Sequence, residues 1–279
     1  MRSSNSLANN VLANNVSAAR CLGFTALARR LRAALFGVAA VLAVSSQASA
    51  ATSACPASKP RHLELPATWA ALAAGRPITI VAFGSSSTEG AGATTPAHAY
   101  PARLQAILRA AWPKVPVTVL NRGLGGQTTD AMLARLDTDV LAAHPTLVIW
   151  QDGANAALRG MEPARFAALL SEGVRRVVAS GADLVLMDNQ VAPRLEQTAH
   201  HATFIATVAH EAAARRVPLF SRAALMREWH AADPAANDMI GADGLHHTDR
   251  GYECLAEALG RAILAPVSPA IMTAQGKRD

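Results

Sequence analysis

Short apolar runs alternate with amphipathic stretches along most of the chain. The apolar runs have the length and composition of buried strands and lie at residues 78–83, 117–120, 146–150, 184–187 and 218–220. Apolar residues at helical spacing predict helices at residues 100–111, 128–143, 163–180, 196–215, 223–232 and 249–264. Residues 51–77 show neither pattern and are expected to cover the surface before the first strand.

The alternation of strands with helices predicts an α/β fold with a parallel sheet. Because the strands are apolar along their whole length, both faces of the sheet should be covered. We therefore expect a three-layer α/β/α sandwich with about five parallel strands. One domain should span residues 78–268, followed by a polar tail at residues 269–279.

The first fifty residues have the features of a secretory signal peptide. Arginines precede an apolar run at residues 33–44, and the segment ends in Ala48-Ser49-Ala50, an Ala-x-Ala cleavage pattern. The run is shorter than the ~20 apolar residues that a membrane span needs. We expect export to the periplasm or medium, a mature chain from Ala51 and no stable membrane insertion. An uncleaved anchor is the alternative.

Charge and cysteine content fit this expectation. The leader holds five arginines and no acidic residue or lysine, so without it the net charge of +6 falls to +1. A near-neutral chain has no footprint for nucleic acid. The leader also contains one of the three cysteines, which leaves Cys55 and Cys254. In an oxidising compartment these two can form a disulfide, and two unpaired thiols are the alternative.

Two polar segments directly follow the first two predicted strands. Gly84–Gly90 holds three adjacent serines, and a serine becomes a nucleophile when a base lies within hydrogen-bond reach. A plain Ser/Thr helix cap is the alternative, and the segment lacks the Gly-x-Ser-x-Gly elbow. Asn121–Thr129 is rich in glycine at a strand-to-helix junction, which suits a developing oxyanion. A phosphate-binding loop or a turn without a ligand are alternatives.

Two further segments carry an amide and an imidazole. Asn155 follows the third strand and could donate to an oxyanion, although an Asn in a loop is also a common turn former. Asp243 lies three residues before His246, so its carboxylate can orient the imidazole while Nε2 accepts a proton. Alternatives are a zinc site at His246 and His247 or a helix cap. We expect no metal or cofactor.

Together and in this order, the four segments resemble the four blocks of the SGNH (GDSL-type) hydrolase superfamily over residues 78–265. The resemblance implies a flavodoxin-like fold. It also assigns roles to five residues. Ser86 matches the nucleophile, and Asp243 and His246 match the acid–base pair. Gly126 and Asn155 match two oxyanion donors, which act together with the N–H of Ser86. His247 is the alternative base.

The implied function is that of an exported serine hydrolase, which cleaves carboxylic or thio esters through an acyl-serine intermediate. Its substrate would be a small-molecule or carbohydrate ester. Residues 189–203 follow the fourth predicted strand and are expected to border the substrate pocket. Two family acids are missing, because Ser85 precedes the nucleophile and Ala156 follows the oxyanion Asn. Asp152 is a candidate to compensate for one of them. An O-acyltransferase acting on a polysaccharide and a non-catalytic carbohydrate-binding relative are the alternatives.

Overall fold

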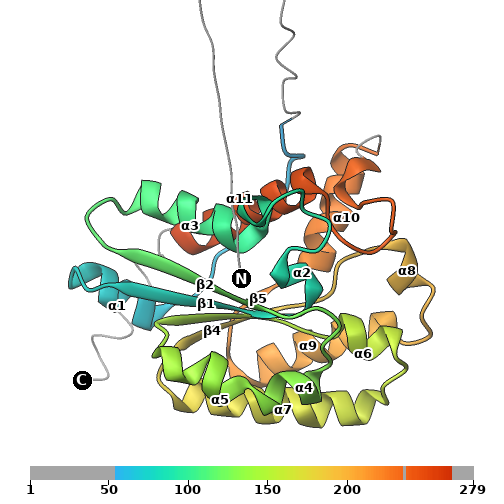
Figure 1. The fold of residues 1–279 in the computed structure, drawn as a ribbon, viewed down its shortest axis with the longest axis horizontal. Coiled ribbons are helices and arrows are strands. Elements are labelled where there is room, and N and C mark those ends of the chain that lie inside the picture. Colours follow the sequence, from blue (N-terminus) through green and yellow to red (C-terminus); the bar gives the residue numbers. More distant parts are fainter. Residues whose placement is uncertain (1–53, 235–236, 266–279) are drawn as a thin grey trace, which may run out of the picture. The chain divides into compact units, whose positions relative to one another are not determined.

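The computed structural model describes residues 54–234 and 237–265, which belong to one compact unit, Thr52–Asp279. The expected leader and polar tail lie outside the described residues. Five parallel strands form the central sheet in the order β2-β1-β3-β4-β5 (Figure 1). They are β1 (Ile78–Gly84), β2 (Val117–Gly123), β3 (Leu147–Gln151), β4 (Asp183–Met187) and β5 (Leu219–Phe220). The predicted parallel sheet and its flavodoxin-like order are confirmed.

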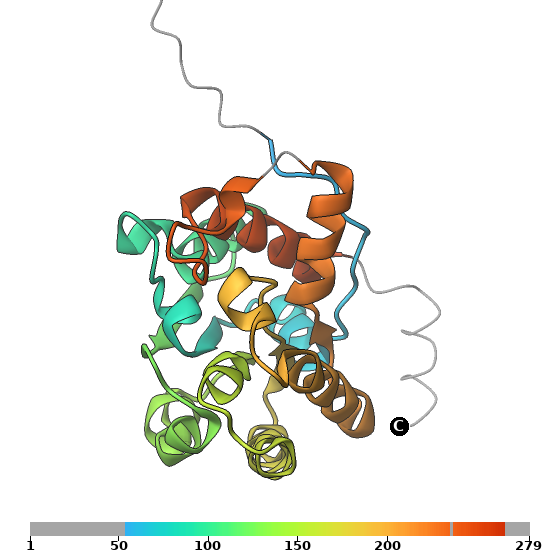
Figure 2. The same ribbon diagram turned by 90° about the vertical axis from the view of Figure 1, so that its right-hand side faces the viewer.

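Helices cover both faces of the sheet, which confirms the predicted three layers (Figures 1 and 2). One layer contains α1 (Pro66–Ala73), α3 (Tyr100–Ala111), α10 (Arg222–Ala232) and α11 (Asp249–Leu264). The other contains α4 (Thr129–Ala134), α5 (Leu136–Asp139), α6 (Ala154–Leu158), α7 (Pro163–Ala179), α8 (Pro193–Glu196) and α9 (His201–Arg215). A short helix, α2 (Ser86–Glu89), follows β1, and short 3-10 turns occupy Pro96–His98, Leu141–Ala143 and Asn237–Met239.

The strand β1 shows why the sheet needs two helical layers. Ile78 and Ile80 pack into the layer with α3 and α11, while Val81 and Phe83 pack into the opposite layer. All four side chains are buried, as successive residues of a strand point to opposite faces. The crossover through α3 covers one face and the crossover through α4 and α5 covers the other. The carboxyl ends of β1 and β3 therefore flank the point where the strand order reverses, where ligands bind in such sheets.

Three predicted segments differ from the structure. The helix expected at residues 196–215 begins only at His201, because α8 ends at Glu196 and residues 197–200 form a turn. The helix expected at residues 128–143 is broken into α4, α5 and the turn at Leu141–Ala143. The break lies at Arg135, whose side chain donates to the carbonyls of Gly84 and Arg122 at the carboxyl ends of β1 and β2, as well as to Asp139 one turn further on. Residues 51–77, expected to lie on the surface, include α1 and bury Leu63 and Leu65 in the core.

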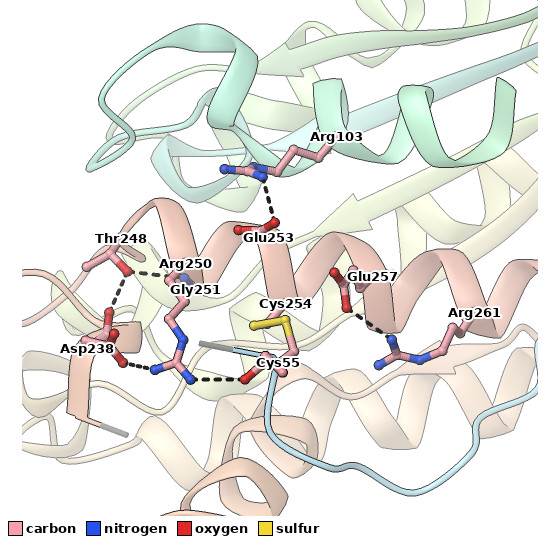
Figure 3. The surroundings of a disulfide bond; sticks show 11 residues. Cys55, Arg103, Asp238, Thr248, Arg250, Gly251, Glu253, Cys254, Glu257 and Arg261 are labelled. Carbon is pink, nitrogen blue, oxygen red and sulfur yellow. Dashed lines mark hydrogen bonds and ion pairs between the residues drawn. A yellow bond between two sulfur atoms is a disulfide. The ribbon is translucent and has the colours of Figure 1, made fainter. Parts of the chain in front are cut away.

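A disulfide joins Cys55 to Cys254 of α11 across 199 residues of sequence (Figure 3). Beside it, Arg250 reaches the carboxylate of Asp238 and donates to the carbonyl of Ala54 at 3.2 Å. These contacts fasten the start of the described chain to the closing helix. Throughout residues 54–234 and 237–265, each helix is too short or too polar to cross a membrane.

Candidate active site

The nucleophile candidate Ser86 begins α2, directly beyond the carboxyl end of β1. Its side chain is half-buried, whereas those of Ser85 and Ser87 on either side are almost completely buried. The turn is closed by backbone bonds from Thr88 and Glu89 to the Ser85 carbonyl at 3.0 and 2.9 Å. Of the three adjacent serines, Ser86 is therefore the one whose hydroxyl is open to a substrate.

A continuous chain of hydrogen bonds runs from Ser86 to Asp243. The Ser86 Oγ lies 2.8 Å from Nε2 of His246, and Nδ1 of His246 lies 2.5 Å from Oδ2 of Asp243. An ionised carboxylate accepts only, so the imidazole proton sits on Nδ1 and Nε2 is free to accept from the Ser86 hydroxyl. The structure thus brings together all three residues that the sequence proposed as nucleophile, base and orienting acid.

Asp243 is held in its ionised form by the turn in which it lies. Partial burial works to raise the pKa of the carboxyl, but donation from the backbone N–H groups of His246 and Leu245 and from the His246 ring outweighs it. The pKa of Asp243 therefore lies below its ordinary value. Both backbone bonds go to Oδ1 at 3.0 Å, which leaves Oδ2 to the imidazole. All three contacts lie within residues 243–246, so a single turn, with Gly244 at a φ of 65°, creates this geometry.

The alternative base, His247, points away from the nucleophile. Its ring is completely buried, and Nδ1 lies 3.0 Å from the carbonyl of Met239, to which it donates. Burial, and then the nearby charge of Arg222, lower its pKa to about 3, so the ring is neutral. The two histidines have different partners, and the described part of the chain shows no group of three or more His, Cys, Asp or Glu arranged to hold a metal.

The glycine-rich loop after β2 lies against the nucleophile turn. The N–H of Leu124 donates to the Gly84 carbonyl at 3.1 Å, which extends the β1–β2 pairing into this loop. A Cβ on Gly123 would come within 2.0 Å of the Glu89 backbone nitrogen, so only glycine allows this approach. Gly126 has a φ of 74°, and its carbonyl accepts from Arg159 at 2.7 Å. This hydrogen bond fixes the peptide group next to the N–H of Gly126, the predicted oxyanion donor.

Asn155 in α6 is tied directly to the same loop. Its Nδ2 donates to the carbonyl of Gln127 at 2.9 Å, which uses one of the two amide hydrogens. Among the described residues, the backbone N–H groups of Ser86 and Gly126 have no protein acceptor. The structure thus places the three predicted oxyanion donors on segments that contact one another at the carboxyl edge of the sheet.

The family model of the Non-GDSL lipase-like family matches residues 49–269. The chain belongs to this family. Its membership, together with SGNH-type structural neighbours, confirms the resemblance to SGNH hydrolases that the four segments predicted.

Two curated relatives are similar over a short stretch. The arylesterase of Vibrio mimicus is 39% identical over 77 residues, 28% of this chain and 38% of that protein. Esterase TesA of Pseudomonas aeruginosa is 35% identical over 75 residues, 27% of this chain and 37% of that protein. The chain therefore matches less than two fifths of either relative's length. A two-domain esterase (CEX) active on acetylated mannans shares the fold, with a TM-score of 0.62, 22% identity and coverage of 71% of this chain and 52% of that one.

Both departures from the family pattern have a structural account. Ser85, in place of an acid, lies 3.4 Å from Oε1 of Gln151 at the end of β3, both through its N–H and through its hydroxyl. Ala156 is completely buried in the apolar layer that includes Phe166, where a carboxylate would lose its hydration. Asp152 accepts from the Gly153 N–H at 2.6 Å, so it closes the turn after β3. Within the described residues, the Asp152 carboxylate makes no hydrogen bond to Ser85 or Ala156, which occupy the positions of the two missing acids.

Sequence reasoning gave no individual role to three polar residues that support the site, although Gln190 lies in the segment 189–203 that was expected to border the substrate. Gln190 and Arg222 are completely or almost completely buried behind the nucleophile turn, and Arg135 joins the carboxyl ends of β1 and β2. Gln190 shows the same signal as the four recognised segments, because it belongs to a polar run directly after a predicted strand. Arg222 begins α10 and Arg135 lies between α4 and α5, and the sequence pattern singled out neither residue.

Proposed function

We propose that this protein is an exported serine esterase that cleaves carboxylic or thio esters through an acyl-Ser86 intermediate. The observation that carries the proposal is the unbroken hydrogen-bond chain from Ser86 through His246 to Asp243. Such a chain activates a hydroxyl by offering its proton to a base whose other nitrogen is already anchored. The matched stretches of an arylesterase and an esterase support ester hydrolysis as the reaction.

The first proton transfer of the proposed reaction joins Ser86 Oγ and His246 Nε2, which are already in contact. His246 Nε2 takes the hydroxyl proton as Ser86 Oγ bonds to the substrate carbonyl carbon, and the carbonyl electron pair moves onto oxygen. The bond to the alcohol or thiol breaks as Nε2 returns the proton to this leaving group. Water then attacks the acyl carbon and gives a proton to Nε2. The acid leaves when the bond to Ser86 Oγ breaks and the proton returns to that oxygen.

The tetrahedral oxyanion would be bound by the N–H groups of Ser86 and Gly126 and by the Asn155 amide. Two features support this assignment: the two backbone N–H groups lack protein acceptors, and the Gly126 and Asn155 segments are joined through Gln127. Donors fixed before the reaction stabilise the charge without reorganising. Asp243 in turn stabilises the imidazolium that forms on His246.

The disulfide between Cys55 and Cys254 supports the proposal of export. Disulfides persist in the periplasm and outside the cell and are rare in the reducing cytosol. The expected leader carries the Ala-x-Ala pattern before Ala51. N-terminal sequencing of the secreted protein should begin at or near Ala51, and a chain that still began at Met1 would contradict cleavage.

A fluorophosphonate probe and a panel of chromogenic esters of increasing acyl length test the activity. Wild-type protein should hydrolyse at least one ester and be labelled at Ser86. Ser86→Ala should lose both, whereas the matched variant Ser87→Ala should keep both. If Ser86→Ala retains turnover and Ser87→Ala loses it, the nucleophile is misassigned. No labelling and no turnover across the panel would instead favour a non-catalytic binding protein, and acyl transfer to an added sugar would favour an acyltransferase.

A further inference from the structure

The side chain of Gln190 connects the nucleophile turn to the acid–base loop. It follows β4, is 1% exposed, and belongs to neither segment. Its Nε2 donates to the carbonyl of Leu245 at 2.9 Å and to the hydroxyl of Ser87 at 3.3 Å. Leu245 lies between Asp243 and His246, and Ser87 is the neighbour of Ser86. One amide group thus spans the two segments whose reactive atoms must meet.

The orientation of this amide is fixed by a buried cation. Nη2 of Arg222 donates to Oε1 of Gln190 at 2.5 Å, and a guanidinium has no acceptor atom. Because Oε1 must therefore face Arg222, Nε2 must face Ser87 and Leu245. Both hydrogens of Nε2 are thus used, one by the nucleophile turn and one by the acid–base loop.

Arg222 is itself held in place by the residues after β4. Its side chain is completely buried, its Nε donates to the carbonyl of Asp188 at 3.2 Å, and the Asp188 carboxylate provides the compensating charge. Burial lowers the pKa of Arg222 to about 10, against the effect of Asp188, so the guanidinium stays charged at neutral pH. Asp188 accepts from Ser221 Oγ at 2.6 Å and from the Ala223 N–H at 2.9 Å, which anchors it to α10.

We propose that Gln190 is a positioning residue that keeps the imidazole of His246 in register with the hydroxyl of Ser86, with Arg222 fixing the orientation of its amide. Ser86 and His246 are 160 residues apart and belong to segments on opposite sides of Gln190 in the sequence. Without the bridge, the acid–base loop keeps its internal bonds to Asp243 but loses this tie to the nucleophile turn. This inference rests on the proposed esterase function.

The variant Gln190→Glu tests the bridge with little change in volume. A carboxylate still accepts from Arg222, but it cannot donate to the Leu245 carbonyl and repels it instead. We expect kcat to fall ~10- to 100-fold with KM within about twofold, since small misplacements of reacting groups lower rates by this order. The rate of fluorophosphonate labelling at Ser86 should fall in parallel, because it reports on the nucleophile and not on substrate binding.

Two matched variants separate the arms of the bridge from a general effect of the substitution. Ser87→Ala removes only the longer of the two Gln190 hydrogen bonds, the 3.3 Å bond to Ser87, so kcat should fall less than in Gln190→Glu. Gln105→Glu makes the same chemical change at a half-buried glutamine that accepts from the Val119 N–H far from the site, and kcat should stay at the wild-type value. If Gln190→Glu does not fold, Gln190→Met removes the same donor without adding a charge and takes its place.

The outcomes distinguish this inference from the esterase proposal. Wild-type activity with an unchanged kcat and labelling rate in a folded Gln190 variant would overturn the positioning role and leave the esterase intact. A change confined to KM or to thermal stability would also overturn it. A wild-type protein without turnover or labelling would overturn the esterase function, and this inference with it.

Discussion

At the scale of single residues, the site depends on polar groups whose partners are already fixed. Asn155 illustrates this, because one amide hydrogen is bound to the Gln127 carbonyl and the other would donate to the proposed oxyanion. The same contact that orients the side chain therefore also holds the neighbouring glycine loop. Loss of the amide should affect turnover far more than stability.

We expect Asn155→Ala to lower kcat ~10²- to 10³-fold, the usual effect of removing one oxyanion donor. The free energy of unfolding should fall by only about 1 kcal/mol, the net worth of one hydrogen bond. Asn155→Asp is the matched control, since its carboxylate has the same size but repels the oxyanion, and it should be at least as slow. Steady-state kinetics with urea unfolding check both values, and an Asn155→Ala variant with wild-type kcat would exclude the role.

The buried carboxyl of Asp152 should make the free energy of unfolding depend on pH. Burial raises its pKa to about 7 from an unfolded value of 3.8, despite partial compensation by Thr129 and the Gly153 N–H. Between about pH 4 and 7 the unfolded chain therefore releases this proton while the folded chain retains it. The contribution of Asp152 to stability falls as pH rises through this window and is constant above it.

Asp152→Asn should remove this penalty while keeping an oxygen that accepts from Gly153. Relative to wild type, the variant should gain stability progressively from pH 4 to 7, by at most ~4 kcal/mol at about 1.4 kcal/mol per pKa unit. Urea unfolding at several pH values measures the difference. Asp137→Asn makes the same substitution at a carboxylate that is 72% exposed and shows the effect of the substitution at the surface. A difference for Asp152→Asn that does not change with pH would contradict the buried carboxyl.

At the scale of elements, Arg135 explains why a stretch with helical spacing does not form one helix. Its guanidinium donates to the carbonyls of Gly84 and Arg122 at 3.0 and 2.9 Å and to the Gln127 side chain at 2.5 Å. It also stacks on Phe83, with 4.4 Å between the guanidinium carbon and the ring centroid. These tertiary contacts offset the backbone bonds lost at the break between α4 and α5.

Arg135→Lys should therefore weaken the junction of β1, β2 and α4. A single ammonium cannot reproduce the fork of donors, so we expect a loss of ~1–3 kcal/mol in the free energy of unfolding and a lower kcat. Arg165→Lys is the matched control, because its side chain is 63% exposed and pairs with Asp130 on the surface. That variant should change stability by less than about 0.5 kcal/mol. Urea unfolding that does not separate the two variants would contradict the account.

At the scale of the whole molecule, the Cys55–Cys254 disulfide closes a loop of nearly all the described chain. A cross-link over 199 residues restricts the unfolded chain strongly, and native disulfides typically contribute ~2–5 kcal/mol. The bond also secures the segment that buries Leu63 and Leu65 before β1. The start of the described chain is thus part of the fold and not an appendage.

Reduction should lower the melting temperature of the wild-type protein, by ~2–4 °C for each kcal/mol lost. The double variant Cys55→Ala/Cys254→Ala should melt near the temperature of the reduced wild type and should not respond to reductant. Calorimetry with and without dithiothreitol measures both. An equal response to reductant in the double variant would assign the effect to something other than this bond.

The sequence by itself determined the features that local patterns encode. Apolar strands and amphipathic helices follow from residue spacing, and the order of strands and helices favours a parallel sheet. The pairing of Asp243 with His246 follows from their spacing of three residues, and the order of the four motifs selected Ser86 among three serines. These features depend on neighbours within one or two turns of chain, or on a motif order that can be read directly.

Only the tertiary structure decided contacts between segments distant in sequence. Four features depend on partners supplied by other elements. They are the Gln190 bridge to Ser87 and Leu245, the buried charge of Arg222, the helix break at Arg135 and the burial of His247. The pairing of Cys55 with Cys254 is of the same kind. A buried polar group is stable only where its partners converge, and that convergence is a property of the packed fold and not of local spacing.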